Sequence, residues 1–310
     1  MGNGGAENVA GPVALADVAV KIQCLIPVNV SLREVAAADP SGRWLVLPRR
    51  AGVVFITLLC TPAAAYRPFD GTDAAVADVK EVEIELQPAG RLQQGADKRL
   101  IGPAIVYNYG FAERWELVVQ GQGETPLSEP GVSSLTEAGV FLKHVLRPGV
   151  LQGQSGLSIA TEFGALLPGI NAERGVGASW AAIVSQRWDW GTVHLNAMTS
   201  LTRDQRGDFF FDAIIEGPST WKVRPVFEVF SDTTWQQTQT YSALVGAIWQ
   251  VRDNLAFDVA TRYALVNDKP VSEFRLGLTF GFPIEGGQRS AEADPGVVFG
   301  NAAERARLAR

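Results

Sequence analysis

Alternation of apolar and polar residues dominates the chain over residues 79–282. In the clearest stretch, Leu255, Phe257 and Val259 share one side of the backbone and Asp258 lies on the other. A period of two residues is typical of β-strands, whereas an amphipathic helix repeats about every 3.6 residues. The pattern therefore predicts an all-β fold for this part of the chain.

The length of the alternating segments indicates strands that cross a membrane. Most segments hold about 9–13 residues, which exceeds the 5–6 residues of a typical soluble strand and suits a strand that crosses a bilayer at a tilt. About twelve strands are expected, at 79–87, 101–109, 114–122, 135–147, 156–167, 175–187, 190–201, 208–216, 221–231, 239–251, 254–264 and 271–282.

The predicted connections also favour a transmembrane barrel. Those at 188–189 and 252–253 are tight, whereas those at 88–100 and 123–134 are long. Short turns at one end and longer loops at the other are typical of outer-membrane barrels, and an even number of strands returns both termini to the same end.

The positions of the charged residues indicate which face of the predicted sheet contacts water. A charge on the lipid face at mid-membrane costs about 2–4 kcal/mol, so the charged face must look inward. Charges opposite the apolar face are expected at Glu81, Glu83, Arg114, Glu116, Glu162, Asp212, Lys222, Arg224, Glu228, Asp258, Arg262, Glu273 and Arg275. From these, the lumen-facing site candidates are Glu83, Glu116, Glu162, Asp212, Arg224, Glu228, Asp258, Arg262 and Arg275.

The sequence thus predicts a closed antiparallel transmembrane β-barrel, but one alternative remains open. A soluble sandwich or lipocalin-like barrel also alternates, with its apolar face inward and its polar face outward, and alternation alone does not separate the two. Aromatic residues near strand ends suit interfacial girdles of a membrane barrel. These residues are Tyr107, Tyr109, Trp115, Trp180, Trp190, Trp221, Trp249 and Tyr263.

Composition excludes several functional classes. A net charge of −6 and a pI near 5.1 argue against nucleic-acid binding, which needs a concentrated basic surface. The mean hydropathy of +0.06 is too low for a bundle of membrane helices. Two histidines and two cysteines form no plausible metal set, and no cofactor is expected.

A secretory signal is predicted at residues 49–65, with cleavage after Ala65. A basic pair, Arg49-Arg50, precedes an apolar stretch and the small-residue site Ala63-Ala64-Ala65, which are the three parts of such a signal. Since a signal begins a chain, residues 1–48 are expected to be over-called translation or a disordered extension. Residues 66–78 are expected to be a periplasmic segment, and residues 283–310 a flexible tail.

Four stretches resemble a known family: Ile105–Leu117, Ser158–Pro168, Ala247–Asp258 and Glu273–Phe282. They are similar to the transporter-like outer-membrane barrels associated with the meta-pathway of phenol degradation. The resemblance implies a location in the outer membrane, contact with its lipid, and passage of small, often aromatic, compounds. It supplies no binding residues. The terminal aromatics Phe280 and Phe282 suit recognition by the barrel assembly machinery.

Three functions remain open from the sequence. The expected one is a passive channel for small molecules, with opposed charges forming a polar constriction. The second is a structural or adhesive barrel with a plugged lumen. The third is a lipid-modifying enzyme based on His194 with Ser200 and Thr192 on its face, or on His144 at the membrane edge. No catalytic residue is assigned, because no G-x-S-x-G motif surrounds a serine.

Overall fold

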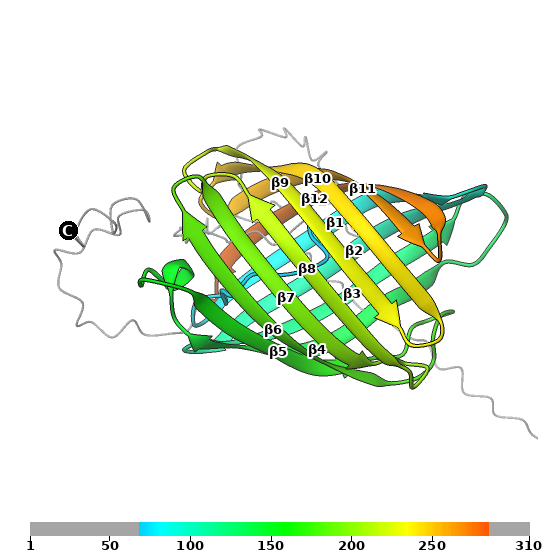
Figure 1. The fold of residues 1–310 in the computed structure, drawn as a ribbon, viewed down its shortest axis with the longest axis horizontal. Coiled ribbons are helices and arrows are strands. Elements are labelled where there is room, and N and C mark those ends of the chain that lie inside the picture. The colour runs from blue at the N-terminus through cyan, green and yellow to red at the C-terminus, as the bar shows by residue number, and fades with distance from the viewer. Residues whose placement is uncertain (1–67, 285–310) are drawn as a thin grey trace, which may run out of the picture. The chain divides into compact units, whose positions relative to one another are not determined.

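Twelve antiparallel strands close into one barrel in the computed structural model, which describes residues 68–284 (Figure 1). A 3₁₀ turn, η1 (Val150–Gln152), lies between β4 and β5. The strands are β1 (Glu81–Gln94), β2 (Asp97–Ala112), β3 (Trp115–Pro126), β4 (Ser134–Arg147), β5 (Ser158–Leu166), β6 (Gly177–Trp188), β7 (Gly191–Leu201), β8 (Gly207–Glu216), β9 (Val223–Thr234), β10 (Thr238–Arg252), β11 (Leu255–Val266) and β12 (Lys269–Pro283).

Pairing between the first and last strands closes the sheet. Ile84 of β1 stands opposite Phe280 of β12, and each remaining strand pairs with its sequence neighbours. Closure removes the free edges that an open sheet would present, so each strand finds hydrogen-bond partners on both sides. The predicted all-β fold, the closed antiparallel barrel and the strand number are therefore confirmed.

The first hairpin differs from its prediction. Residues 88–100 were expected to be a long loop, but β1 continues to Gln94 and β2 starts at Asp97. The register shifts between Leu86 and Ala89, which marks a β-bulge. A bulge inserts extra residues and breaks the two-residue period, so the strand continues where its sequence signal stops.

The two faces of the sheet have opposite chemistry. Phe257 and Val259 point outward and are 42% and 41% exposed, whereas Asp258 between them is 6% exposed. Glu228 and Asp212 are fully buried on the inner side. The apolar side chains therefore coat the barrel and the ionisable ones line its interior, as the sequence predicted for a membrane barrel and contrary to the soluble alternative.

Two of the expected inward charges lie elsewhere. Arg114 lies in the turn between β2 and β3, and Lys222 lies in the connection before β9; both are exposed. The sequence pattern placed both one or two residues inside a strand, and strand ends are where such patterns fail. In the described part of the chain, no helix is long and apolar enough to cross a membrane.

Residues 68–80 form a lumenal segment that precedes β1 and crosses the inside of the barrel. Its backbone or side chains bond to residues of β2, β3, β4, β6, β7, β9, β11 and β12. The sequence placed residues 66–78 on the periplasmic side, and the described part of that range lies in the lumen instead. Residues 1–48, 49–65 and 285–310, on which other predictions fall, lie outside the described range.

Candidate functional site

The lumen holds the charges that the sequence assigned to it. Glu83, Glu116, Asp212, Glu228, Asp258 and Arg275 are buried, and Glu162, Arg224 and Arg262 are partly covered. They come from nearly every side of the barrel, since alternate residues of β1, β3, β5, β8, β9, β11 and β12 point inward. The structure does not bring them into one ring; it divides them into clusters around the lumenal segment.

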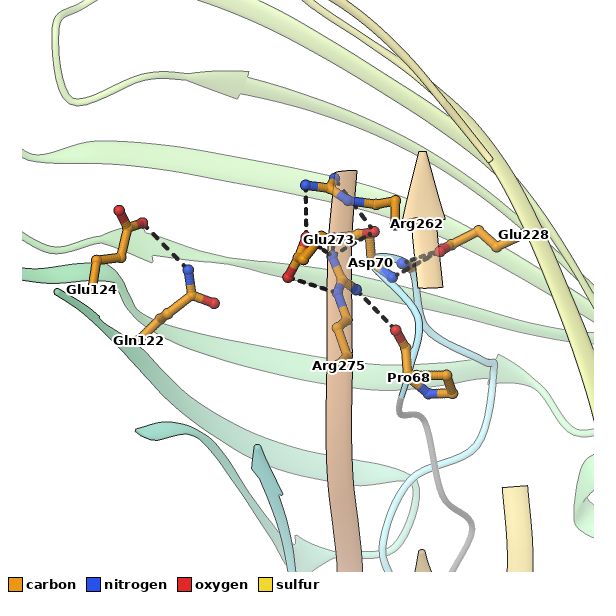
Figure 2. Close-up of polar contacts among 9 residues, drawn as sticks. Pro68, Asp70, Gln122, Glu124, Glu228, Arg262, Glu273 and Arg275 are labelled. Atoms are coloured by element: carbon orange, nitrogen blue, oxygen red, sulfur yellow. Dashed lines mark hydrogen bonds and ion pairs between the residues drawn. The ribbon is translucent and has the colours of Figure 1, made fainter. Parts of the chain in front are cut away.

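One cluster ties the start of the lumenal segment to β11 and β12 (Figure 2). Arg275 donates to both carboxylate oxygens of Asp70, at 2.9 and 3.1 Å, and to the carbonyl oxygen of Pro68 at 2.9 Å. The Glu273 carboxylate forms ion pairs with the guanidinium groups of Arg275, at 3.0 Å, and Arg262, at 2.9 Å. Each buried guanidinium therefore faces a carboxylate, which is the condition under which charges are tolerated inside a protein.

Lumenal carboxylates accept hydrogen bonds from the backbone of the segment. Glu228 receives the N–H groups of Asp70 and Gly71 at 3.0 and 2.9 Å, as Figure 2 shows for Asp70. Glu116 receives the N–H of Ala77. These hydrogen bonds to carboxylate oxygens anchor the segment at two separated points.

The opposite wall holds the middle of the segment. Asn196 donates to the carbonyl oxygen of Thr72 at 2.9 Å, and the ammonium of Lys143 donates to the Thr72 hydroxyl at 3.1 Å. Ser185 accepts the N–H of Ala74 at 2.9 Å, and Ala74 is fully buried. The segment is thus fixed across the lumen rather than along one side of it.

Glycine allows the closest approaches between segment and wall. A Cβ on Gly71 would lie 1.6 Å from Oδ2 of Asp212, and a Cβ on Gly110 of β2 would lie 2.1 Å from the carbonyl oxygen of Asp78. Any side chain at these positions would force backbone or a buried carboxylate to move. The two glycines therefore set how tightly the lumenal segment fits.

The two histidines lie in different environments. His144 faces outward and stacks on Trp115 with 4.1 Å between ring centroids, so the predicted apolar-face position is confirmed. His194 faces the lumen and contacts Oγ of Ser185 at 2.8 Å and Glu216 at 3.5 Å. Sequence reasoning had paired His194 with Ser200 and Thr192 instead.

The Ser185, His194 and Glu216 set has the residue types of a hydrolase triad without its accessibility. Ser185 is fully buried, and its hydroxyl already accepts the N–H of Ala74. A nucleophile must reach the substrate carbon, and the lumenal segment occupies that approach. We therefore interpret this set as part of the anchor of the segment.

One cavity lies beside the lumenal segment and another lies nearer the end of the barrel. A chamber of about 230 Å³ lies between the segment and the inner face of β1 to β8, and a vestibule of about 320 Å³ lies at the barrel end that carries Glu124, Glu137 and Arg203. The inward residues of β3 run from Glu116 and Gln120 in the chamber to Glu124 in the vestibule. Among the described residues, no group of His, Cys, Asp and Glu side chains could hold a metal ion.

Sequence reasoning missed several lumenal residues. Lys143, Arg187, Glu216 and Asp70 all belong to the charge clusters. Neighbouring side chains of a strand point to opposite faces, so the outward position of His144 on β4 could have placed Lys143 in the lumen. Asp70 carried no such signal, since its segment has no periodic pattern.

Loss of Arg275 is expected to loosen the lumenal segment. In a background with Cys24 and Cys60 replaced by Ser, a Thr72→Cys variant should react slowly with a maleimide. Adding Arg275→Met removes the bonds to Asp70 and Pro68, each worth about 1.5–3 kcal/mol with a charged partner, so the labelling rate should rise about tenfold or more. Adding Arg203→Met instead is the matched control, since Arg203 donates to the carbonyl oxygens of Leu167 and Ala138 and pairs with Glu173, none of which belongs to the segment or its anchors. Equal rates in the two variants would contradict this anchor.

Comparisons with known proteins find distant structural similarity and no matching family. No family model matches the sequence, and no curated protein matches it. Similar solved structures include an outer-membrane channel from Pseudomonas putida F1 (TM-score 0.48, 10% identity, 68% of this chain and 97% of that one) and the KdgM porin (0.45, 12%, 64% and 98%). The CymD monoaromatic hydrocarbon channel is a third (0.41, 10%, 68% and 90%). The resemblance to the meta-pathway family is not confirmed by these searches.

Proposed function

We propose that the protein is an outer-membrane channel through which small molecules diffuse passively, and that the lumenal segment closes it. The observation that carries the proposal is the combination of an apolar coat, an ionisable lumen and, within residues 68–284, one segment across that lumen. The apolar coat is compatible with contact to lipid, and the ionisable lumen is compatible with water. What separates the two ends of the pathway is a short stretch of chain held by side-chain contacts.

The outer surface supports placement in a membrane. Exposed apolar side chains continue around the barrel, from Ile105 on β2 through Leu195 on β7 to Leu276 on β12. A soluble monomer rarely exposes an apolar patch of more than a few hundred Å², and this coat includes exposed apolar side chains on every strand from β2 to β12. Exposed Trp190 and Tyr263 near strand ends suit the two interfaces of a bilayer.

Topology supports an orientation. Glu81 and Pro283 stand opposite each other, so both ends of the barrel chain lie at one rim. In outer-membrane barrels the termini and short turns face the periplasm. The vestibule, at the other rim, then faces outward and forms the entrance.

The permeant is proposed to be small and partly apolar. Phe69 of the segment and Phe210 of β8 line the chamber beside polar groups. This mixture agrees with the sequence resemblance to transporter-like barrels of phenol degradation. The resemblance is the finer part of the proposal and rests on the four quoted stretches alone.

Conductance in planar bilayers tests the proposal. The full protein should open in discrete steps, and a variant lacking residues 68–78 should stay open with larger steps, because the segment no longer crosses the lumen. A silent full protein with a conducting deletion variant would favour the alternative of a plugged structural barrel. Silence from both proteins would overturn the channel.

A further inference from the structure

We propose that the chamber beside the lumenal segment selects small organic cations that carry an apolar body. This inference rests on the proposed channel function and names its class of permeant. Four features of the chamber favour such a permeant: its balance of charge, an unengaged carboxylate, the apolar part of its wall and its route to the vestibule.

Negative groups outnumber positive groups around the chamber. Asp70, Glu85, Glu116 and Glu162 line it, and Lys143 is the cation among its lining residues in the described part. Lys143 stands between Glu116 and Glu162 across the sheet, and its ammonium already donates to Thr72 of the segment. Asp70 is paired with Arg275 and Arg262, so the remaining acidic groups, Glu85, Glu116 and Glu162, share this one ammonium.

Glu162 is the carboxylate that the protein leaves available. Asp70 binds Arg275, Glu85 accepts from Asn108, and Glu116 accepts from Ala77. Within residues 68–284, no hydrogen bond and no ion pair within 4 Å engages the Glu162 carboxylate; its cross-strand neighbour Lys143 lies 3.9 Å from Asp73 of the segment instead. A carboxylate in this position gains most from a ligand that brings its own positive charge.

Glu83 adds a second unengaged carboxylate on the same wall. Its side chain is buried, at 6% exposure, and its Oε1 has no hydrogen-bond partner. Glu83 stands opposite Asn108, which lines the chamber, and shares the lumenal side of β1 with Glu85. Both unengaged groups are acidic, so the selectivity they favour is for cations rather than for anions.

The rest of the chamber wall suits a compact apolar body. Phe69 and Phe210 present aromatic rings, and Met198 adds an adaptable thioether side chain. Aromatic faces attract organic ammonium groups and also pack against apolar rings. The volume of about 230 Å³ is below the range of drug-sized pockets, which restricts the occupant to a small molecule.

A polar track leads to the chamber from the vestibule. Gln120 lies in the chamber, and Gln122 follows on the same side of β3 with a 3.4 Å hydrogen bond to Glu124 (Figure 2). In the vestibule, Glu124, Glu137 and Glu173 stand beside Arg99 and Arg203, both of which are held in ion pairs. The negative excess therefore begins at the entrance, where it raises the local concentration of cations.

Uptake by proteoliposomes tests the inference with three solutes of one shape: benzylamine, benzyl alcohol and benzoate. With the full protein, benzylamine should enter about tenfold faster than benzoate, with benzyl alcohol between them. Glu162→Gln should lower the ratio of benzylamine to benzoate by roughly fivefold. Glu113→Gln removes the same charge from an exposed turn and should leave the ratio unchanged.

The outcomes separate this inference from the proposed function. Entry of no solute, together with silence in bilayers, would overturn the channel itself. Equal entry of all three solutes, or faster entry of benzoate, would overturn the cation preference and leave the channel standing. A preference that survives Glu162→Gln unchanged would overturn the assignment to this chamber.

Discussion

A Gly71→Leu variant is expected to open the channel permanently, with single-channel steps approaching those of the protein that lacks residues 68–78. The Cβ would lie 1.6 Å from Oδ2 of Asp212, so the segment or the wall must move. Asp212 is fully buried, and its other carboxylate oxygen accepts two hydrogen bonds from Asn196, at 3.0 and 2.7 Å. Asp212 also belongs to β8, whose backbone is paired with β7 and β9, whereas the segment is held near residue 71 through side-chain contacts, so displacement of the segment is the expected response.

Planar bilayer recordings measure this effect, and Gly207→Leu is its matched control. Gly207 begins β8 and does not have a left-handed backbone conformation. A Cβ at this position would have no other atom within 4 Å. The Gly207→Leu variant should show single-channel steps of the same size as those of the unchanged protein. Resistance of both barrels to unfolding by detergent at room temperature would establish that each has formed. Unchanged steps in a folded Gly71→Leu barrel would mean that the segment does not limit conduction.

The closed and open states are coupled through the same carboxylates. Glu228 and Glu116 accept backbone N–H groups from the segment when it occupies the lumen. Deleting residues 68–78 removes these donors together with Asp70, Asp73 and Asp78, and it takes away carboxylates that face Arg262, Arg275 and Lys143. We therefore expect the deletion variant to prefer cations less strongly than the full protein does.

The barrel wall could be predicted because lipid imposes a strict rule on it. Each strand must keep one face apolar over about the thickness of the membrane, and this rule appears in the sequence as long alternating segments. The predicted ends differ from the observed ends by a few residues at most strands. The exception is the hairpin of β1 and β2, where a bulge after Leu86 breaks the period while the strand continues.

The lumenal segment could not be predicted, because its partners meet only when the barrel closes. Asp70 contacts Glu228 across 158 positions of sequence and Arg275 across 205. The segment itself is short and rich in Asp and Ala, without the alternation of a strand. The alternation of side chains predicted that Glu228 and Arg275 face the lumen, but it carries no information about which charged groups contact each other.

A charge at the middle of the outer face is expected to destabilise the barrel strongly. Val245 is the central residue of β10 and is 57% exposed on the apolar coat, where lipid offers no partner for a guanidinium. Val245→Arg should lower the free energy of unfolding from lipid vesicles by about 2–4 kcal/mol. Val223→Arg is the matched control, because Val223 is 53% exposed but begins β9 near the rim, where the cost is about 0–1 kcal/mol. Denaturant titration of both variants in vesicles measures the difference. Equal losses at the two positions would show that depth in a membrane does not govern this surface, and the assignment of the apolar coat to lipid would be wrong.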